Sequence, residues 1–122
     1  MKKILIVEDE QALLDLLVEQ FKSEDFDVIS AVDGKQGLEK VKSVKPDLVL
    51  LDIIMPVLDG MSMLTEMRKN DWGKNVPVIM LTNLSDDEKV ADCAEKGVYE
   101  YLIKSDWSME DVVKKVRQKL GM

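Results

Sequence analysis

The sequence predicts an α/β protein with a doubly wound parallel sheet of five strands, covered by helices on both faces. Apolar runs typical of buried strands alternate with stretches of helical periodicity, five of each along 122 residues. One run, Leu48–Leu51, is apolar at consecutive positions, as in a strand buried on both faces of a parallel sheet. Right-handed crossovers between such strands lead to the (βα)5 arrangement, and for five strands the order 2-1-3-4-5 is the common one. We expect residues 1–122 to form one domain.

Each element has a local reason in the sequence. Helices are expected where apolar residues recur at helical spacing behind a capping residue, and strands where short β-branched or apolar runs stand between turn residues. The expected elements are a strand at 4–7, a helix at 11–23, a strand at 26–32, a helix capped by Asp33, a strand at 47–54, a helix capped by Asp59 and closed by Trp72-Gly73, a strand at 76–81, a helix capped by Ser85 and ended by Gly97, a strand at 99–103 and a helix capped by Ser108.

Composition restricts the class of protein. Twenty-four acidic against seventeen basic residues give a net charge of −7, which provides no electrostatic footprint for nucleic acid or for an anionic membrane. The single Cys93 cannot form an internal disulfide, so a reducing compartment is the simpler interpretation. No apolar run is long enough for a signal peptide or a membrane span, and a cytoplasmic location is expected. The absence of histidine excludes histidine catalysis and histidine metal ligands.

Polar side chains stand where four of the five predicted strands end. Glu8 and Asp9 follow the first strand, Asp52 ends the third, Thr82 the fourth and Lys104 the fifth. In a parallel sheet these ends face the same way, so the residues are expected to share one crevice. Three carboxylates repel one another unless compensated, and a partly hydrated Mg²⁺ suits such oxygen ligands. With a lysine and a hydroxyl, the crevice is equipped to hold a phosphoryl group on a carboxylate oxygen.

Each of these residues also has a purely structural explanation. Asp9 could cap the helix that follows it, a lysine at a strand end usually points to solvent, and threonine is an ordinary strand former. Asp52 is harder to explain in this way, because Pro56 lies too close for a helix to start next to it. The joint placement at four strand ends favours a functional site.

The residues at the strand ends carry a resemblance to a known family. The matching segments are Ile4–Asp9, Leu50–Gly60, Leu81-Thr82 and Tyr101–Lys104. They resemble the motifs of the receiver domain of response regulators in two-component signalling, in order and at the right distances, over the whole chain. The resemblance implies a flavodoxin-like sandwich. Because the chain ends directly after the last predicted helix, we expect a stand-alone regulator or a fragment of a longer one.

The resemblance implies a role for each residue of the acidic crevice. Asp52 would be the phosphoacceptor, taking a phosphoryl group from a sensor histidine kinase, a phosphotransfer protein or a small phosphodonor. Asp9 and Asp52 would ligate Mg²⁺ directly, together with the backbone carbonyl of Ile54, and Glu8 would act through water. The protein would then catalyse only its own phosphorylation and dephosphorylation, and would not be an enzyme acting on other substrates.

The same resemblance implies how the signal leaves the site. Lys104 would contact the phosphoryl oxygens, Thr82 would swing towards them, and Tyr101 would turn inward behind it. The surface of the fourth helix, fifth strand and fifth helix would then bind a downstream protein partner, without direct contact to nucleic acid or membrane. The basic side chains of the last helix (Lys114, Lys115, Arg117 and Lys119) are interpreted as its solvated face.

The sequence departs from the family pattern near the site. Ser105 follows Lys104 where the family usually has proline, often after a cis peptide; a cis bond here costs about 3 kcal/mol, so this peptide is either trans or strained. Asn83 stands where the family more often has a smaller residue, so we expect narrower access to the phosphorylation site. Ile54 and Leu84, each two residues beyond a key side chain, are apolar and cannot orient an attacking water. They predict a long-lived phosphoaspartate.

Three other interpretations compete with the receiver. Aspartyl phosphatases that use Mg²⁺ carry a D-x-D motif, in which the second aspartate is the general acid. In this chain Ile54 stands at that second position, so the general acid is missing. A nucleotide binder would need a Gly-, Ser- or Thr-rich loop after the first strand, where Glu8-Asp9-Glu10 carries the opposite charge. A phosphorylation-independent scaffold on the same fold is the alternative from another class; the intact Asp52, Thr82 and Lys104 argue against it.

Overall fold

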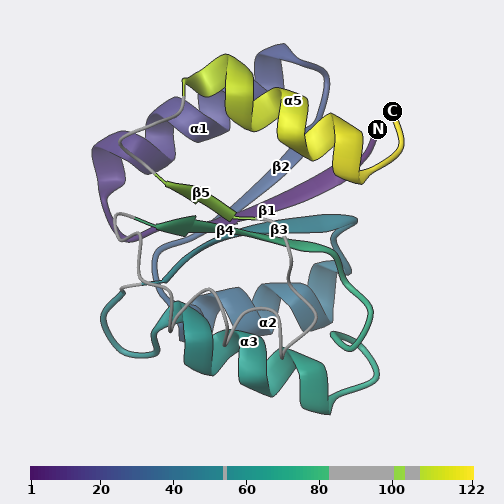
Figure 1. The fold of residues 1–122 in the computed structure, drawn as a ribbon. Coiled ribbons are helices and arrows are strands. Elements are labelled where there is room, and N and C mark those ends of the chain that lie inside the picture. The colour runs from purple at the N-terminus through teal and green to yellow at the C-terminus, as the bar shows by residue number, and fades with distance from the viewer. Residues whose placement is uncertain (54, 83–100, 104–107) are drawn as a thin grey trace.

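A computed structural model describes residues 1–53, 55–82, 101–103 and 108–122, with the side chains of 82 and 101–103 excepted. One sheet lies between two layers of helices, with α1 and α5 on one face and α2 and α3 on the other (Figure 1). The strands are β1 (Lys3–Val7), β2 (Asp27–Ala31), β3 (Leu48–Asp52), β4 (Val78–Thr82) and β5 (Tyr101–Ile103), and the described helices are α1 (Gln11–Ser23), α2 (Gly34–Val44), α3 (Gly60–Lys69) and α5 (Met109–Lys119). Among these helices none has the length and apolar character to cross a membrane.

The sheet has the expected order and direction. Its strands run β2-β1-β3-β4-β5, and every neighbouring pair is parallel. Val7 pairs with Leu51, and Asp52 pairs with Leu81. The carboxyl ends of β1, β3 and β4 therefore lie at the same edge of the sheet, as the sequence predicts.

β3 is buried along its whole length and separates two apolar cores. Leu48 and Leu50 pack with the apolar faces of α1 and α5, whereas Val49 and Leu51 pack with those of α2 and α3. All four side chains have no exposed surface. The unbroken apolar run in the sequence is thus explained by a strand with a core on each side.

Three predicted N-caps are confirmed. Asp33 accepts a hydrogen bond from the amide of Gln36 at 2.8 Å, and Asp59 accepts one from Ser62 at 2.8 Å. Ser108 and Asp111 form a reciprocal capping box at the start of α5. The Gln36 side chain accepts from the amide of Val32 rather than from Asp33 itself. The cap predicted at Ser85 and the helix end at Gly97 lie outside the described residues.

α3 ends earlier than the sequence predicts. Its last residue is Lys69, followed by Asn70 in an extended conformation, and not Trp72-Gly73. The Asn70 side chain donates to the carbonyl of Glu66 at 2.8 Å, which satisfies one of the helix's last acceptors. Arg68 stabilises the segment between α3 and β4, because its guanidinium donates to the carbonyls of Gly73 and Val76. Burial lowers the pKa of this guanidinium.

Candidate functional site

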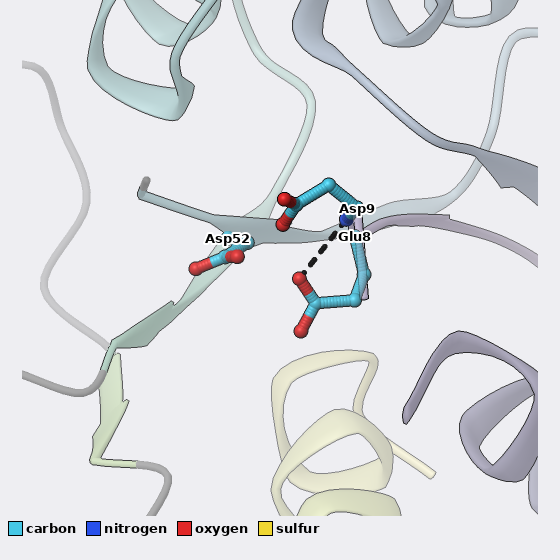
Figure 2. A group of neighbouring side chains, drawn as sticks. All are labelled: Glu8, Asp9 and Asp52. Carbon is cyan, nitrogen blue, oxygen red and sulfur yellow. Dashed lines mark hydrogen bonds between the residues drawn. The ribbon is translucent and has the colours of Figure 1, made fainter. Parts of the chain in front are cut away.

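Three acidic side chains meet at the carboxyl edge of the sheet. Glu8 and Asp9 directly follow β1, and Asp52 is the last residue of β3 (Figure 2). One carboxylate oxygen from each lies within 4.8 Å of the other two. Glu8 has no exposed surface and Asp52 is 5% exposed, whereas Asp9 is exposed. The predicted meeting of these residues is confirmed.

Backbone pairing fixes the two segments that carry the carboxylates. The amide of Glu8 donates to the Ala31 carbonyl at 3.1 Å, so β1 stays paired with β2 beyond its last residue. The amide of Ile53 donates to the Leu81 carbonyl at 3.2 Å, which holds β3 against β4 just after Asp52. The Glu8 carboxylate also accepts from the amide of Asp9 at 3.1 Å. These bonds set the positions from which the acidic side chains project.

The helix after β1 does not use Asp9 as a cap. α1 begins at Gln11, its N-cap residue is Glu10, and the Glu10 side chain makes no capping hydrogen bond. Asp9 lies one residue before that cap and extends toward the other two carboxylates (Figure 2). The structural explanation of Asp9 as a helix cap is therefore wrong.

The acidic cluster suits a hard divalent cation. Like charges at this spacing repel by on the order of a few kcal/mol per pair at protein dielectric values, and burial of Glu8 and Asp52 reduces solvent screening. Carboxylate oxygens at one open edge, with Asp9 facing water, are the ligands that Mg²⁺ takes when it keeps part of its hydration shell. The carboxylates of Glu8, Asp9 and Asp52 therefore fit a partly hydrated Mg²⁺ ion.

The loop after Asp52 is closed by hydrogen bonds that the sequence did not predict. The amide of Gly60 donates back to the Ile53 carbonyl at 2.8 Å, and a Cβ on Gly60 would fall 2.9 Å from the carbonyl carbon of Asp52. Only glycine allows this approach. The Asp59-Gly60 pair, interpreted from the sequence as a turn and a helix cap, is thus also the point where the loop returns to β3.

The remaining predicted site residues are only partly described. Thr82 ends β4 and Tyr101 begins β5, which places their backbones on neighbouring strands. The side chains of Thr82 and Tyr101 lie outside the described part of the structure, as do residues Ile54, Asn83, Leu84, Lys104 and Ser105 in full. Their predicted roles, and the cis or trans state of the Lys104–Ser105 peptide, stay predictions.

Comparison with known proteins gives one consistent family. The family model described as the response regulator receiver domain matches residues 4–117. Response regulator ArlR of Staphylococcus saprophyticus is 37% identical over 121 residues, which are 98% of this chain and 53% of that protein. PhoP, the alkaline phosphatase synthesis transcriptional regulatory protein of Bacillus subtilis, is 35% identical over 84% of this chain and 42% of its own length. The chain spans about half the length of these curated relatives.

Solved structures agree with this result. The receiver domain of the Francisella response regulator 1452 superposes with a TM-score of 0.90 at 28% identity, covering 99% of this chain and 98% of that one. The receiver domain of sensor histidine kinase PA1611 from Pseudomonas aeruginosa has a TM-score of 0.88 at 27% identity, with 99% and 98% covered. That structure is described with a magnesium ion coordinated in its active site cleft.

Proposed function

Since this chain belongs to the response regulator receiver domain family, we propose that it is a phosphorylation-activated switch whose phosphoacceptor is Asp52. The observation that carries the proposal is the meeting of Asp52 with Glu8 and Asp9, whose carboxylate oxygens lie within 4.8 Å of one another. The phosphoryl group would come from a sensor histidine kinase, a phosphotransfer protein or a small phosphodonor. We place this reaction in the cytoplasm, as the composition suggests.

The reaction needs little from the protein beyond position and charge. A carboxylate oxygen of Asp52 attacks phosphorus, a new O–P bond forms, and the bond from phosphorus to the donor nitrogen or oxygen breaks, leaving its electron pair on the donor. Asp9 and Asp52 would hold Mg²⁺ directly, with the Ile54 carbonyl as a further ligand and Glu8 acting through water. When bound, the ion neutralises charge on the phosphoryl oxygens. Rigid pairing of β3 with β1 and β4 keeps the attacking oxygen in place.

Lys104, Thr82 and Tyr101 complete the proposal. Lys104 supplies a fixed positive charge to the phosphoryl oxygens, Thr82 turns its hydroxyl towards them, and Tyr101 follows inward. The surface of the fourth helix, β5 and α5 then binds a downstream protein. The chain acts on no other substrate and catalyses only its own phosphorylation and dephosphorylation. The sheet supports this coupling, because Thr82 and Tyr101 stand on adjacent strands beside the edge that bears Asp52.

Intact mass after incubation with Mg²⁺ and acetyl phosphate tests the proposal. We expect one phosphoryl adduct, which is absent when EDTA replaces Mg²⁺ and absent in Asp52→Asn. Glu39→Gln, which removes an exposed carboxylate from the middle of α2, is the matched control and should accept the phosphoryl group as the wild type does. If the wild type forms no adduct with acetyl phosphate, with phosphoramidate or with autophosphorylated kinases, the result favours a phosphorylation-independent scaffold instead.

A further inference from the structure

A pocket of about 370 Å³ lies at the amino edge of the sheet, opposite to the edge that bears the acidic site. The ends of α3 and α5 lie on the same side of the molecule as the segment that leads into β4 (Figure 1). The residues that line this amino-edge pocket are Arg68, Lys74, Asn75, Val76, Pro77, Val78 and Lys119. Val78 begins β4, and Leu81, which pairs with Asp52, lies about 10 Å further along the strand. The pocket is therefore separate from the acidic site.

The amino-edge pocket is lined by positive charge in a chain that is acidic as a whole. Three of its seven lining residues are basic and none is acidic. In the whole sequence, by contrast, 24 acidic residues stand against 17 basic ones. A concave surface lined by charges of one sign concentrates ions of the opposite sign. The charge of this pocket therefore favours an anion.

The helix ends explain only part of this charge. Arg68 belongs to the last turn of α3 and Lys119 to that of α5, where cations interact favourably with the helix dipole. Lys74 belongs to neither helix, and within the described part of the chain its exposed ammonium makes no hydrogen bond or ion pair. Lys69, also in the last turn of α3, pairs with Glu66 at 3.3 Å and does not line the pocket. Lys74 thus has no structural partner that accounts for its place.

Arg68 is a fixed charge in this pocket. Its Nη1 donates to the Gly73 carbonyl at 2.9 Å and to the Val76 carbonyl at 3.0 Å, which holds the guanidinium against the segment before β4. The side chain is half-buried, and burial lowers its pKa because the charged form has lost part of its hydration. A bound anion would offset that loss. The pocket therefore offers a positioned positive charge that gains from a negative ligand.

The remaining lining suits an organic group. Val78 is almost fully buried, and Val76 and Pro77 are partly exposed. The carboxamide of Asn75 adds one neutral polar group to this lining. Apolar walls with a few polar groups are typical of small-molecule sites, whose volumes run from roughly 300 to 1,000 Å³. The volume of this pocket falls within that range.

From these observations we propose that the amino-edge pocket binds a phosphate group carried by a small organic molecule. Lys74, Arg68 and Lys119 would surround the phosphate, and the apolar lining would contact the organic part. Phosphate fits three cations better than a carboxylate does, because it carries close to two negative charges and three acceptor oxygens. The proposal does not depend on phosphorylation of Asp52.

An NMR titration of the whole chain with phenyl phosphate, in EDTA, tests the proposal. We expect saturable shifts of the amides of Lys74, Asn75 and Val76, while those of Glu8 and Asp9 stay in place. Inorganic phosphate should shift the same amides with a dissociation constant about fivefold higher, because it makes no apolar contact. Equal constants for the two probes would overturn the organic ligand. Unchanged amides in the pocket, or shifts at Glu8 and Asp9 instead, would overturn the site and leave the proposed function intact.

Two lysine variants test the place of binding. Lys74→Ala should raise the dissociation constant for phenyl phosphate about tenfold, because it removes a charge-assisted hydrogen bond. Lys69→Ala is the matched control, since it removes the same charge from an exposed residue outside the pocket, and it should change the constant less than about twofold. Both side chains are exposed, so both variants are expected to fold. Equal losses in the two variants would show attraction by overall charge alone and would overturn the proposal.

Discussion

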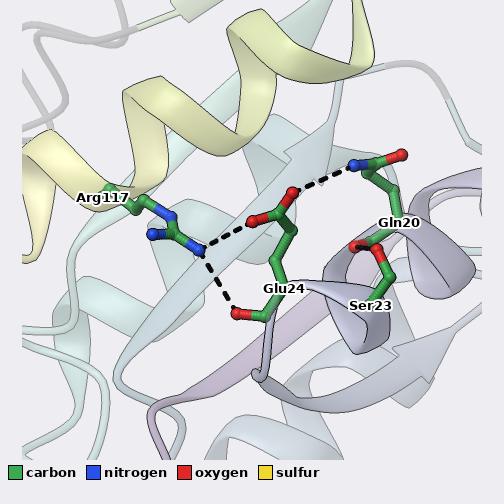
Figure 3. A network of polar contacts seen from close by, with 4 residues as sticks. All are labelled: Gln20, Ser23, Glu24 and Arg117. Atoms are coloured by element: carbon green, nitrogen blue, oxygen red, sulfur yellow. Dashed lines mark hydrogen bonds and ion pairs between the residues drawn. The ribbon is translucent and has the colours of Figure 1, made fainter.

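Arg117 on α5 binds Glu24, the C-cap residue that follows α1. Its Nη2 donates to Glu24 Oε2 at 2.8 Å and to the Glu24 carbonyl at 3.3 Å (Figure 3). The guanidinium carbon also lies 5.6 Å from the centre of the Phe26 ring. Gln20 donates to the second Glu24 oxygen at 3.4 Å. The prediction that Arg117 belongs to a merely solvated face of α5 is therefore wrong, because this side chain connects the two helices that cover one face of the sheet.

Arg117→Ala should lower the free energy of unfolding by about 1 kcal/mol, because it removes a half-exposed ion pair, a helix-end contact and a cation–π contact that are each small. Urea denaturation followed by circular dichroism measures the change. Lys114→Ala removes an exposed charge from the same helix and should change stability by less than about 0.5 kcal/mol. Equal effects of the two substitutions would show that the contact with Glu24 contributes nothing.

In EDTA, Asp52→Asn should raise the free energy of unfolding by about 1 kcal/mol, because the substitution removes one of three clustered negative charges. Added Mg²⁺ should stabilise the wild type more than the variant, since binding to the folded state alone shifts the unfolding equilibrium. Melting curves with and without Mg²⁺ measure both effects. A wild type and variant that respond equally to Mg²⁺ would contradict a metal site that includes Asp52.

Val57→Gly should stabilise the protein by about 1 kcal/mol. A β-branched residue with φ of +68° carries strain, and its side chain, 76% exposed, has little packing to lose. Val57→Ala keeps the Cβ and should recover much less. Chemical denaturation of the three proteins makes the comparison; a gain in alanine as large as that in glycine would point to the exposed apolar surface rather than to the backbone.

Ile54→Asn combined with Leu84→Glu should shorten the lifetime of the phosphoaspartate severalfold, because polar side chains can orient the attacking water that the apolar pair cannot. The decay of the adduct, followed by intact mass after removal of acetyl phosphate, gives the rate. The two single variants provide the controls, and each should decay at an intermediate rate. An unchanged lifetime in the double variant would mean that these residues only shield the loops.

The sequence was sufficient to predict the acidic site because two local signals combine there. The unbroken apolar run of Leu48–Leu51 indicates a strand buried on both faces, and parallel strands end at one edge. With the common strand order, which places the first and third strands side by side, Asp52 and the Glu8-Asp9 pair were expected to meet, as they do. Helix starts were predictable for a similar reason, because a capping side chain such as Asp59 bonds within its own first turn.

The contacts that the sequence did not predict join segments far apart in the chain. Gly34 follows the cap residue Asp33, and nothing in the neighbouring sequence shows that glycine is needed there. The need arises from Leu58, because a Cβ on residue 34 would fall 2.9 Å from the Leu58 carbonyl carbon. Arg117 looks like its exposed neighbours on α5, and its partner lies 93 residues away. The early end of α3 depends on a side-chain bond from Asn70 that competes with one more helical turn.

β3 contributes alternate side chains to both apolar cores, and Asp52 is attached to its last position. Exposing this strand to solvent requires both helical layers to separate from the sheet, so its amides should exchange with deuterium only through unfolding of the whole domain. The proposed phosphoacceptor therefore stands on the strand that we expect to open last. If phosphorylation adds charge at Asp52, we expect β3 to keep its position, because it is packed on both faces. The change of shape is then expected in the segments around the strand.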